Sequence, residues 1–172
     1  MLEENTTVSI YENPDQVQGT LMELGKFGFD LKRVSVIGKA YGDPEEPVAY
    51  YNQGNKLQCW GERSEFWNVL CRMIREWVLF SCPGTGLLLV IGPIAEWVVA
   101  VLNNSAIFFG MSALGATLYS MGVARDRVQD CEEALRNGSY LLIVHGPAQE
   151  VIQAKKILRS ANYMLSNECN KK

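Results

Sequence analysis

Glu96 is the residue of this sequence whose position most needs a chemical explanation. It is the one charged side chain in the apolar run 77–124. A lone carboxylate is costly to bury in an apolar environment unless it is protonated, paired or close to water. The nearest cations in the preceding segment are Arg72 and Arg75, so we expect one of them to form a buried ion pair with Glu96. The alternative places Glu96 at a helix end or a subunit interface.

Two glycine–proline clusters interrupt the same run. The first, Pro-Gly-Thr-Gly at 83–86, resembles turns whose N–H groups bind anions before a helix. No Gly-Lys-Ser/Thr follows it and no basic residue lies near it, so we predict a hinge between two apolar helices instead. The residues of this predicted hinge region are Pro83, Gly84, Gly86, Gly92 and Pro93.

The chain has one histidine and five cysteines, and their spacing does not suggest a metal site. His145 precedes an expected helix and could act as a base or bind an anion, but without a nearby partner pattern a structural role is favoured. The cysteines form no Cys-x-x-Cys pair, so we predict neither a metal nor a cofactor. No nucleophile–base arrangement is recognisable, and the sequence therefore predicts a protein that is not an enzyme.

Charge and cysteine usage limit the partners and the compartment. The net charge of −3 does not favour a nucleic-acid partner. An odd number of cysteines and an N-terminus without a basic and apolar leader favour a reducing interior. Arginines on both sides of the apolar run would keep both of its ends on the cytoplasmic side. We expect a location in the cytoplasm or on the cytoplasmic side of the cell membrane.

The apolar run itself must be buried against something. The flanking segments already contain enough apolar residues for the core of a 172-residue chain. Apolar surface left in water costs roughly 25 cal/mol per Å². Segments 86–103 and 105–123 come close to the length of a spanning helix, and Asn103-Asn104 provides a polar turn between them. The run is therefore expected to contact lipid or other copies of the chain.

The second of these segments has small residues at steps of three and four. Such a stripe lets two helix backbones approach closely and is typical of helix interfaces in membranes. A tight helix contact in a soluble oligomer explains the pattern equally well. The predicted helix-packing or oligomer interface consists of Ala106, Gly110, Ala113, Thr117 and Ser120.

The flanking segments have the patterns of an α+β domain. Residues 6–11 and 31–39 read as strands, separated by a helix that begins at Pro14 with Asn13 as its cap. A hairpin is expected over 48–60, and a helix fits 62–82. After the apolar run we expect a polar helix, an apolar strand over 139–144 and another helix.

The prediction is a ferredoxin-like split β-α-β sheet with an inserted apolar α-helical hairpin. Residues 1–61 and 125–172 are the two halves of its α+β domain. Residues 62–124 are the apolar helical insert, which serves as a membrane hairpin or as oligomerisation helices.

Six short motifs carry a resemblance to a known family. They are VSIYENPDQV, GKFGFDLKRVSVIGK, VAYYNQGNKLQCWG, FSCPGTGLLLVIGPI, GATLYSMGVARDRV and YLLIVHGPAQEV. In this order they resemble the bacterial general stress proteins of the heat-induced stress protein type, over about 7–158. The resemblance implies an association with stress responses and brings no established catalytic residues. This chain differs from the family pattern at Cys82 and Thr85, and has fewer glycines in its middle segment.

Two functional hypotheses follow. The first is a non-enzymatic, stress-associated protein that attaches to the membrane, or assembles with itself, through the apolar helical insert. The alternative is a soluble homo-oligomer whose ferredoxin-like domain binds a small ligand or a partner protein.

Overall fold

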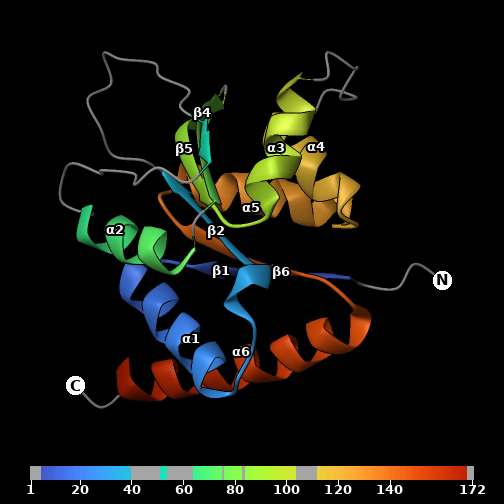
Figure 1. The fold of residues 1–172 in the computed structure, drawn as a ribbon. Helices are drawn as coiled ribbons and strands as arrows, with labels where there is room; N and C mark the ends of the chain where they lie inside the picture. The colour runs from blue at the N-terminus through green and yellow to red at the C-terminus, as the bar shows by residue number, and fades with distance from the viewer. Residues whose placement is uncertain are drawn as a thin grey trace.

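The computed structural model of the protein describes residues 5–39, 51–53, 64–74, 76–82, 84–103 and 112–169. These residues form three layers, with helices on both faces of one sheet (Figure 1). The helices on one face are α1 (Pro14–Lys26), α2 (Ser64–Met73) and α6 (Ala148–Cys169). Those on the other face are α3 (Ile94–Asn103), α4 (Ala113–Ser120) and α5 (Arg125–Arg136).

The sheet has six strands in the order β1-β6-β2-β5-β4-β3, and each neighbouring pair is antiparallel. The strands are β1 (Thr6–Tyr11), β2 (Val34–Lys39), β3 (Tyr51–Gln53), β4 (Glu76–Cys82), β5 (Gly86–Ile91) and β6 (Tyr140–His145). In the β1–β6 pair, Val8 lies opposite Ile143 and Ile10 lies opposite Leu141. The predicted pairing of the two flanking segments in one sheet is therefore confirmed.

β1, α1 and β2 form a split β-α-β unit. β6 lies between β1 and β2 and is antiparallel to both, so β1 and β2 run parallel to each other and α1 joins them. However, β1 lies at an edge of the sheet, whereas a ferredoxin-like sheet holds its first strand in the interior. The protein belongs to the α+β class as predicted, but the ferredoxin-like topology is not confirmed.

The start of α1 shows how local sequence determines an element. The side chain of Asn13 accepts a hydrogen bond from Gln16 N at 3.0 Å, and Pro14 occupies the first turn, where a missing N–H costs little. Val17, Leu21 and Leu24 then recur at helical spacing, and all three are buried against the sheet. The predicted cap and buried face of this helix are confirmed.

The predicted helix over 62–82 is wrong in its second half. α2 ends at Met73, and β4 and β5 follow where the prediction placed the end of one helix and the start of another. Alternate residues of β4 face opposite helical layers: Trp77 belongs to one buried cluster, Phe80 to the other. A strand buried on both faces reads as a continuous apolar run, which periodicity cannot distinguish from a buried helix. The expected helical hairpin insert is therefore not confirmed.

The predicted hinge between apolar helices is also corrected. Gly84 and Gly86 have φ values of 82° and 109° and form the turn of the β4–β5 hairpin, in which Thr85 N donates to Cys82 O at 3.1 Å. Pro83 lies outside the described residues. Gly92 and Pro93 connect β5 to α3. The first cluster therefore turns one strand into the next, and the second turns a strand into a helix. Gly84, Gly86 and Gly92 have positive φ, which glycine adopts without steric cost.

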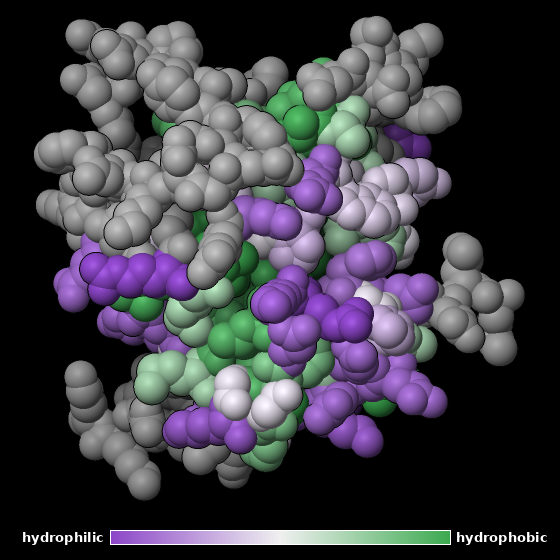
Figure 2. Space-filling view, viewed as in Figure 1, coloured by the Kyte–Doolittle hydropathy of each residue, from purple (hydrophilic) through white to green (hydrophobic). Residues whose placement is uncertain are grey.

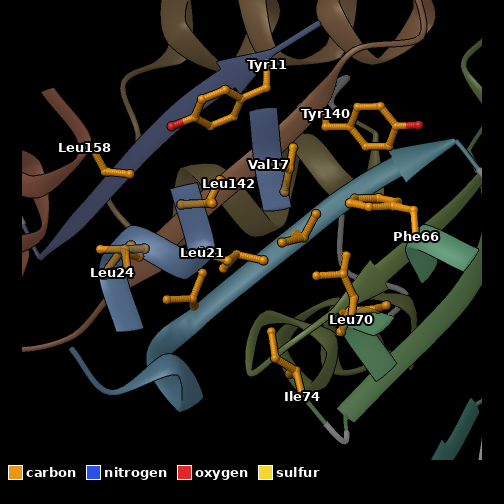
Figure 3. Packing of buried hydrophobic residues seen from close by; sticks show 14 of the residues in the cluster. Tyr11, Val17, Leu21, Leu24, Phe66, Leu70, Ile74, Tyr140, Leu142 and Leu158 are labelled. Carbon is orange, nitrogen blue, oxygen red and sulfur yellow. The ribbon is translucent and has the colours of Figure 1, made fainter. Parts of the chain in front are cut away.

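Each face of the sheet has its own buried cluster. One lies between the sheet and α1, α2 and α6, and Figure 3 shows Leu21 of α1 and Leu70 of α2 pointing toward the strands in this cluster. Its aromatic part includes Phe66 and Tyr140, whose ring centroids are 5.3 Å apart in an edge-to-face arrangement. The other cluster lies between the sheet and α3, α4 and α5.

The aromatic rings leave no room for a side chain at Gly38 in β2. A Cβ atom there would lie 2.6 Å from Tyr140 Cδ1 and 2.9 Å from Trp67 Cζ2. Glycine at this position therefore lets the two rings pack directly against the backbone of the sheet.

Candidate functional site

A side chain of β2 hydrogen-bonds to the first residue of α3. The side chain of Ser35 accepts a hydrogen bond from Ile94 N at 3.1 Å, so a strand residue satisfies one of the free N–H groups of the helix. Gly92 precedes the helix with φ of 122°, and a Cβ atom there would lie 2.5 Å from both Val34 O and Ser35 Oγ. The path from β5 into α3 therefore passes directly against the backbone of β2.

Three large hydrophobic side chains on α3 and α4 are exposed. Trp97 is 40 % exposed, Leu102 46 % and Tyr119 55 %. The same two helices bury Val98, Leu114 and Leu118 against the sheet. Figure 2 shows hydrophobic residues at the upper end of α3, with more hydrophilic residues beside them. We call Trp97, Leu102 and Tyr119 the α3 surface.

His145 links the end of β6 to three other parts of the chain. Its Nδ1 atom lies 2.7 Å from Thr6 Oγ1 on β1. Thr6 Oγ1 also donates to the carbonyl oxygen of Met121, just after α4, at 2.8 Å. The ring of Trp97 on α3 contacts the His145 imidazole edge-to-face, with centroids 5.3 Å apart. One half-buried histidine thus connects two strands with the helical layer that carries the α3 surface.

The Thr6 hydroxyl contacts both the Met121 carbonyl oxygen, which can only accept, and the His145 imidazole. The direction of the hydrogen bond between Thr6 and His145 depends on which ring nitrogen carries the hydrogen. Burial lowers the pKa of His145, and a hydrogen bond to the backbone of Asn5 partly opposes this effect. The ring therefore favours its neutral form.

The predicted buried ion pair between Glu96 and Arg72 is wrong. Glu96 is exposed in the first turn of α3, and Arg72 is exposed in the last turn of α2, on the other face of the sheet. Arg75 lies outside the described residues. The alternative position, at a helix end, is where the structure places Glu96. There the carboxylate reaches water, which removes the cost that suggested a buried partner.

A second carboxylate lies near Glu96. Burial raises the pKa of Glu76 at the start of β4, and the negative charge of Glu96 raises it further. The two acidic groups come together because β4 starts, and β5 turns into α3, at the same end of the sheet.

The predicted stripe of small residues is only partly described. Ala106 and Gly110 lie outside the described residues. Ala113 is half-buried, Thr117 is buried and Ser120 is exposed. Thr117 Oγ1 donates to Ala113 O at 2.8 Å within α4. The described part of the stripe thus includes half-buried, buried and exposed positions, and its role as an interface stays a prediction.

The described cysteines and acidic residues do not form a recognisable reactive centre. Cys82 and Cys131 are free and buried, and burial raises the pKa of the Cys131 thiol to about 11. A thiol with such a pKa is a poor nucleophile at neutral pH. In the described ranges, no three His, Cys, Asp or Glu side chains are grouped to hold a metal ion. None of the helices in these ranges is long and apolar enough to cross a membrane.

Sequence reasoning missed three residues that position this region: Thr6, Ser35 and Arg127. Thr6 contacts Met121, Ser35 contacts Ile94, and Arg127 Nη2 donates to Val8 O at 3.1 Å. The partners are separated by 59 to 119 positions along the chain. Local spacing contains no signal for such contacts, because they depend on how the layers pack.

Comparisons with protein-family models, with curated proteins and with solved structures give no match. The resemblance to stress proteins of the heat-induced type therefore stays a prediction.

Proposed function

We propose that the protein is a non-enzymatic, stress-associated protein that assembles with further copies of itself through the α3 surface. The observation that carries self-assembly is the exposure of Trp97, Leu102 and Tyr119 on neighbouring helices. Apolar area removed from water contributes roughly 25 cal/mol per Å², so covering these side chains would favour association. The stress association rests on the resemblance of the six sequence motifs.

A second copy fits the α3 surface better than an anionic membrane does. α3 and α4 contain Glu96 and no lysine or arginine, and the whole chain has a net charge of −3. Anionic lipid headgroups attract basic segments and repel acidic ones. A second copy presents the same apolar side chains, and a two-fold interface would cover both sets at once.

The test is the mass of the full chain in solution as a function of its concentration, measured by light scattering. We expect the wild-type protein to associate, and Trp97→Asp and Leu102→Asp to shift it toward the monomer, because each would bury an unpaired carboxylate in the interface. Met22→Asp is the matched control. Met22 is 62 % exposed on α1, across the sheet from α3, so this change adds the same charge away from the proposed interface.

Other results would contradict the proposal in distinguishable ways. A wild-type mass that stays monomeric at every concentration excludes self-assembly. If the wild-type chain sediments with phosphatidylglycerol vesicles and Leu102→Asp does not, the α3 surface contacts a membrane instead. If Met22→Asp dissociates the assembly as strongly as Trp97→Asp, then added charge and not the α3 surface explains the effect.

A further inference from the structure

β1 is an edge strand, and its backbone orientation can be assigned residue by residue. Within the described ranges it pairs with β6 alone. Gly146 N donates to Asn5 O at 3.0 Å, so the backbone groups of Asn5 face β6. In an antiparallel pair, residues with both backbone groups toward the partner alternate with residues whose groups point away. Thr7 and Ser9 therefore face β6, and the backbone groups of Thr6, Val8 and Ile10 point outward.

Arg127 covers the middle of this outward edge. Its Nη2 atom donates to the carbonyl oxygen of Val8 at 3.1 Å, which agrees with the outward assignment of Val8. Arg127 belongs to the first turns of α5, so the helical layer extends a cation to the edge of the sheet. A charge placed on an edge strand is a common means by which proteins prevent pairing with another chain.

The strand behind this cation is well suited to pairing. Its sequence, TTVSIY, contains no charged residue and is rich in β-branched side chains. Ile10 is 37 % exposed next to the free edge. Short uncharged segments of this kind readily add a further strand when their edge is open.

We infer that β1 is a pairing surface for β1 of a second copy, and that Arg127 keeps this surface closed. An antiparallel β1–β1 pair has a two-fold axis, so the same outward groups of Thr6, Val8 and Ile10 serve both copies. Forming this β1–β1 pair requires Arg127 to leave Val8 O in each copy. It also brings the two Arg127 side chains, which carry like charges, to one edge. The inference does not depend on the α3 surface, because the outward backbone groups of β1 are not part of that surface.

The test compares two arginines of the same helix. Arg127→Ala removes the cation from the edge, and Arg136→Ala removes an equal charge from the exposed last turn of α5. Both are made in the full chain with Leu102→Asp, so that association through the α3 surface does not contribute. We expect Arg127→Ala to tighten dimerisation on the order of tenfold relative to Arg136→Ala, which corresponds to about 1.4 kcal/mol.

A proline substitution in β1 tests whether a new dimer forms through this strand. Ile10→Pro removes an outward N–H and leaves the bonds to β6 intact, a substitution that edge strands tolerate. Added to Arg127→Ala, it should restore the monomer. Arg127→Gln, which also lacks the charge and keeps more of the side chain, is used if the alanine variant does not melt cooperatively. Equal dimerisation of the Arg127 and Arg136 variants, or a dimer that persists with Ile10→Pro, would overturn the inference.

Discussion

The helices on the two faces of the sheet differ in where their charged residues lie. α1 has Asp15, Glu23 and Lys26 on its exposed or half-buried positions, and its buried residues form one stripe. α3 buries Ile94, Ala95 and Val98 on one side and exposes Trp97 on another. Leu102 follows Val98 by four residues, so it continues the buried side and is exposed near the end of the helix. Burial against the sheet therefore requires one apolar side of each helix, and the exposure of Trp97 and Leu102 needs a separate explanation.

The two faces also use glycine differently. On the face covered by α3, Gly92 has a positive φ and lies against the backbone of β2. On the other face, Gly38 lies under the rings of Tyr140 and Trp67. One glycine thus permits contact between two backbones, and the other permits contact between a backbone and side chains.

Gly92→Ala is expected to have the largest effect on folding. The new Cβ atom would collide with Val34 O and the backbone of Ser35, and alanine would have to adopt the φ of 122°. Strain and overpacking together should lower the free energy of unfolding by roughly 2–5 kcal/mol, as measured by urea titration. In Gly84→Ala, at φ of 82° with no atom within 4 Å of the new Cβ, the cost should be about 1–2 kcal/mol. Equal costs at the two positions would show that the contact with β2 contributes nothing.

Gly38→Ala should be less costly than Gly92→Ala. The atoms that the new methyl group meets, Tyr140 Cδ1 and Trp67 Cζ2, belong to side chains that can shift, and no positive φ is involved. We expect a loss of roughly 1–3 kcal/mol in the free energy of unfolding and altered near-ultraviolet circular dichroism from the displaced rings. Gly25→Ala in α1 is the control. Its nearest atom, Leu31 Cδ1, is 4.0 Å away, so alanine there should stabilise the helix.

His145→Gln should have the smallest effect, and this effect depends on pH. Because burial places the folded-state pKa of His145 below its usual 6.5, the unfolded chain binds the proton more readily than the folded chain. Wild-type stability should therefore fall as the pH drops below about 6.5, through the folded-state pKa, and this part of the loss should be absent in His145→Gln. Thermal unfolding between pH 7.5 and pH 5 measures the difference. Parallel pH profiles for the two proteins would show that His145 contributes no such dependence.

The sequence was informative where one face of an element meets water, or where turn residues bound a short apolar strand. The cap at Asn13, the stripe of Val17, Leu21 and Leu24, and the pairing of the terminal halves all follow from local residue patterns. β4 and β5 are covered by helices on both faces, which removes the alternation that reveals a strand. The same is true of β6, but turn residues, Asn137-Gly138 and Gly146-Pro147, bound that strand in the sequence. The run 76–91 was misassigned because no such residues separate the helical pattern of α2 from β4. Glu96 was placed in an apolar interior as part of the same misassignment.

The contacts around the candidate site could not be predicted for a different reason. His145 was singled out by its position before a helix, but its partners Thr6 and Trp97 come from distant segments. Arg127 was interpreted only as part of the positive charge after the apolar run. Which strand edge it reaches depends on how α5 packs against the sheet, and residue types alone do not specify that packing.

The position of β6 between β1 and β2 has a consequence for the order of folding during synthesis. Thr6 and His145 are 139 residues apart, so among the described strands β1 has no partner until β6 has been made. At about 5–20 residues per second the ribosome needs on the order of ten seconds to cover that distance. During this time β1 exposes both of its edges and β2 exposes one. Sheets dominated by such distant pairings fold slowly, and nascent chains with unpaired strands are the ones that chaperones bind.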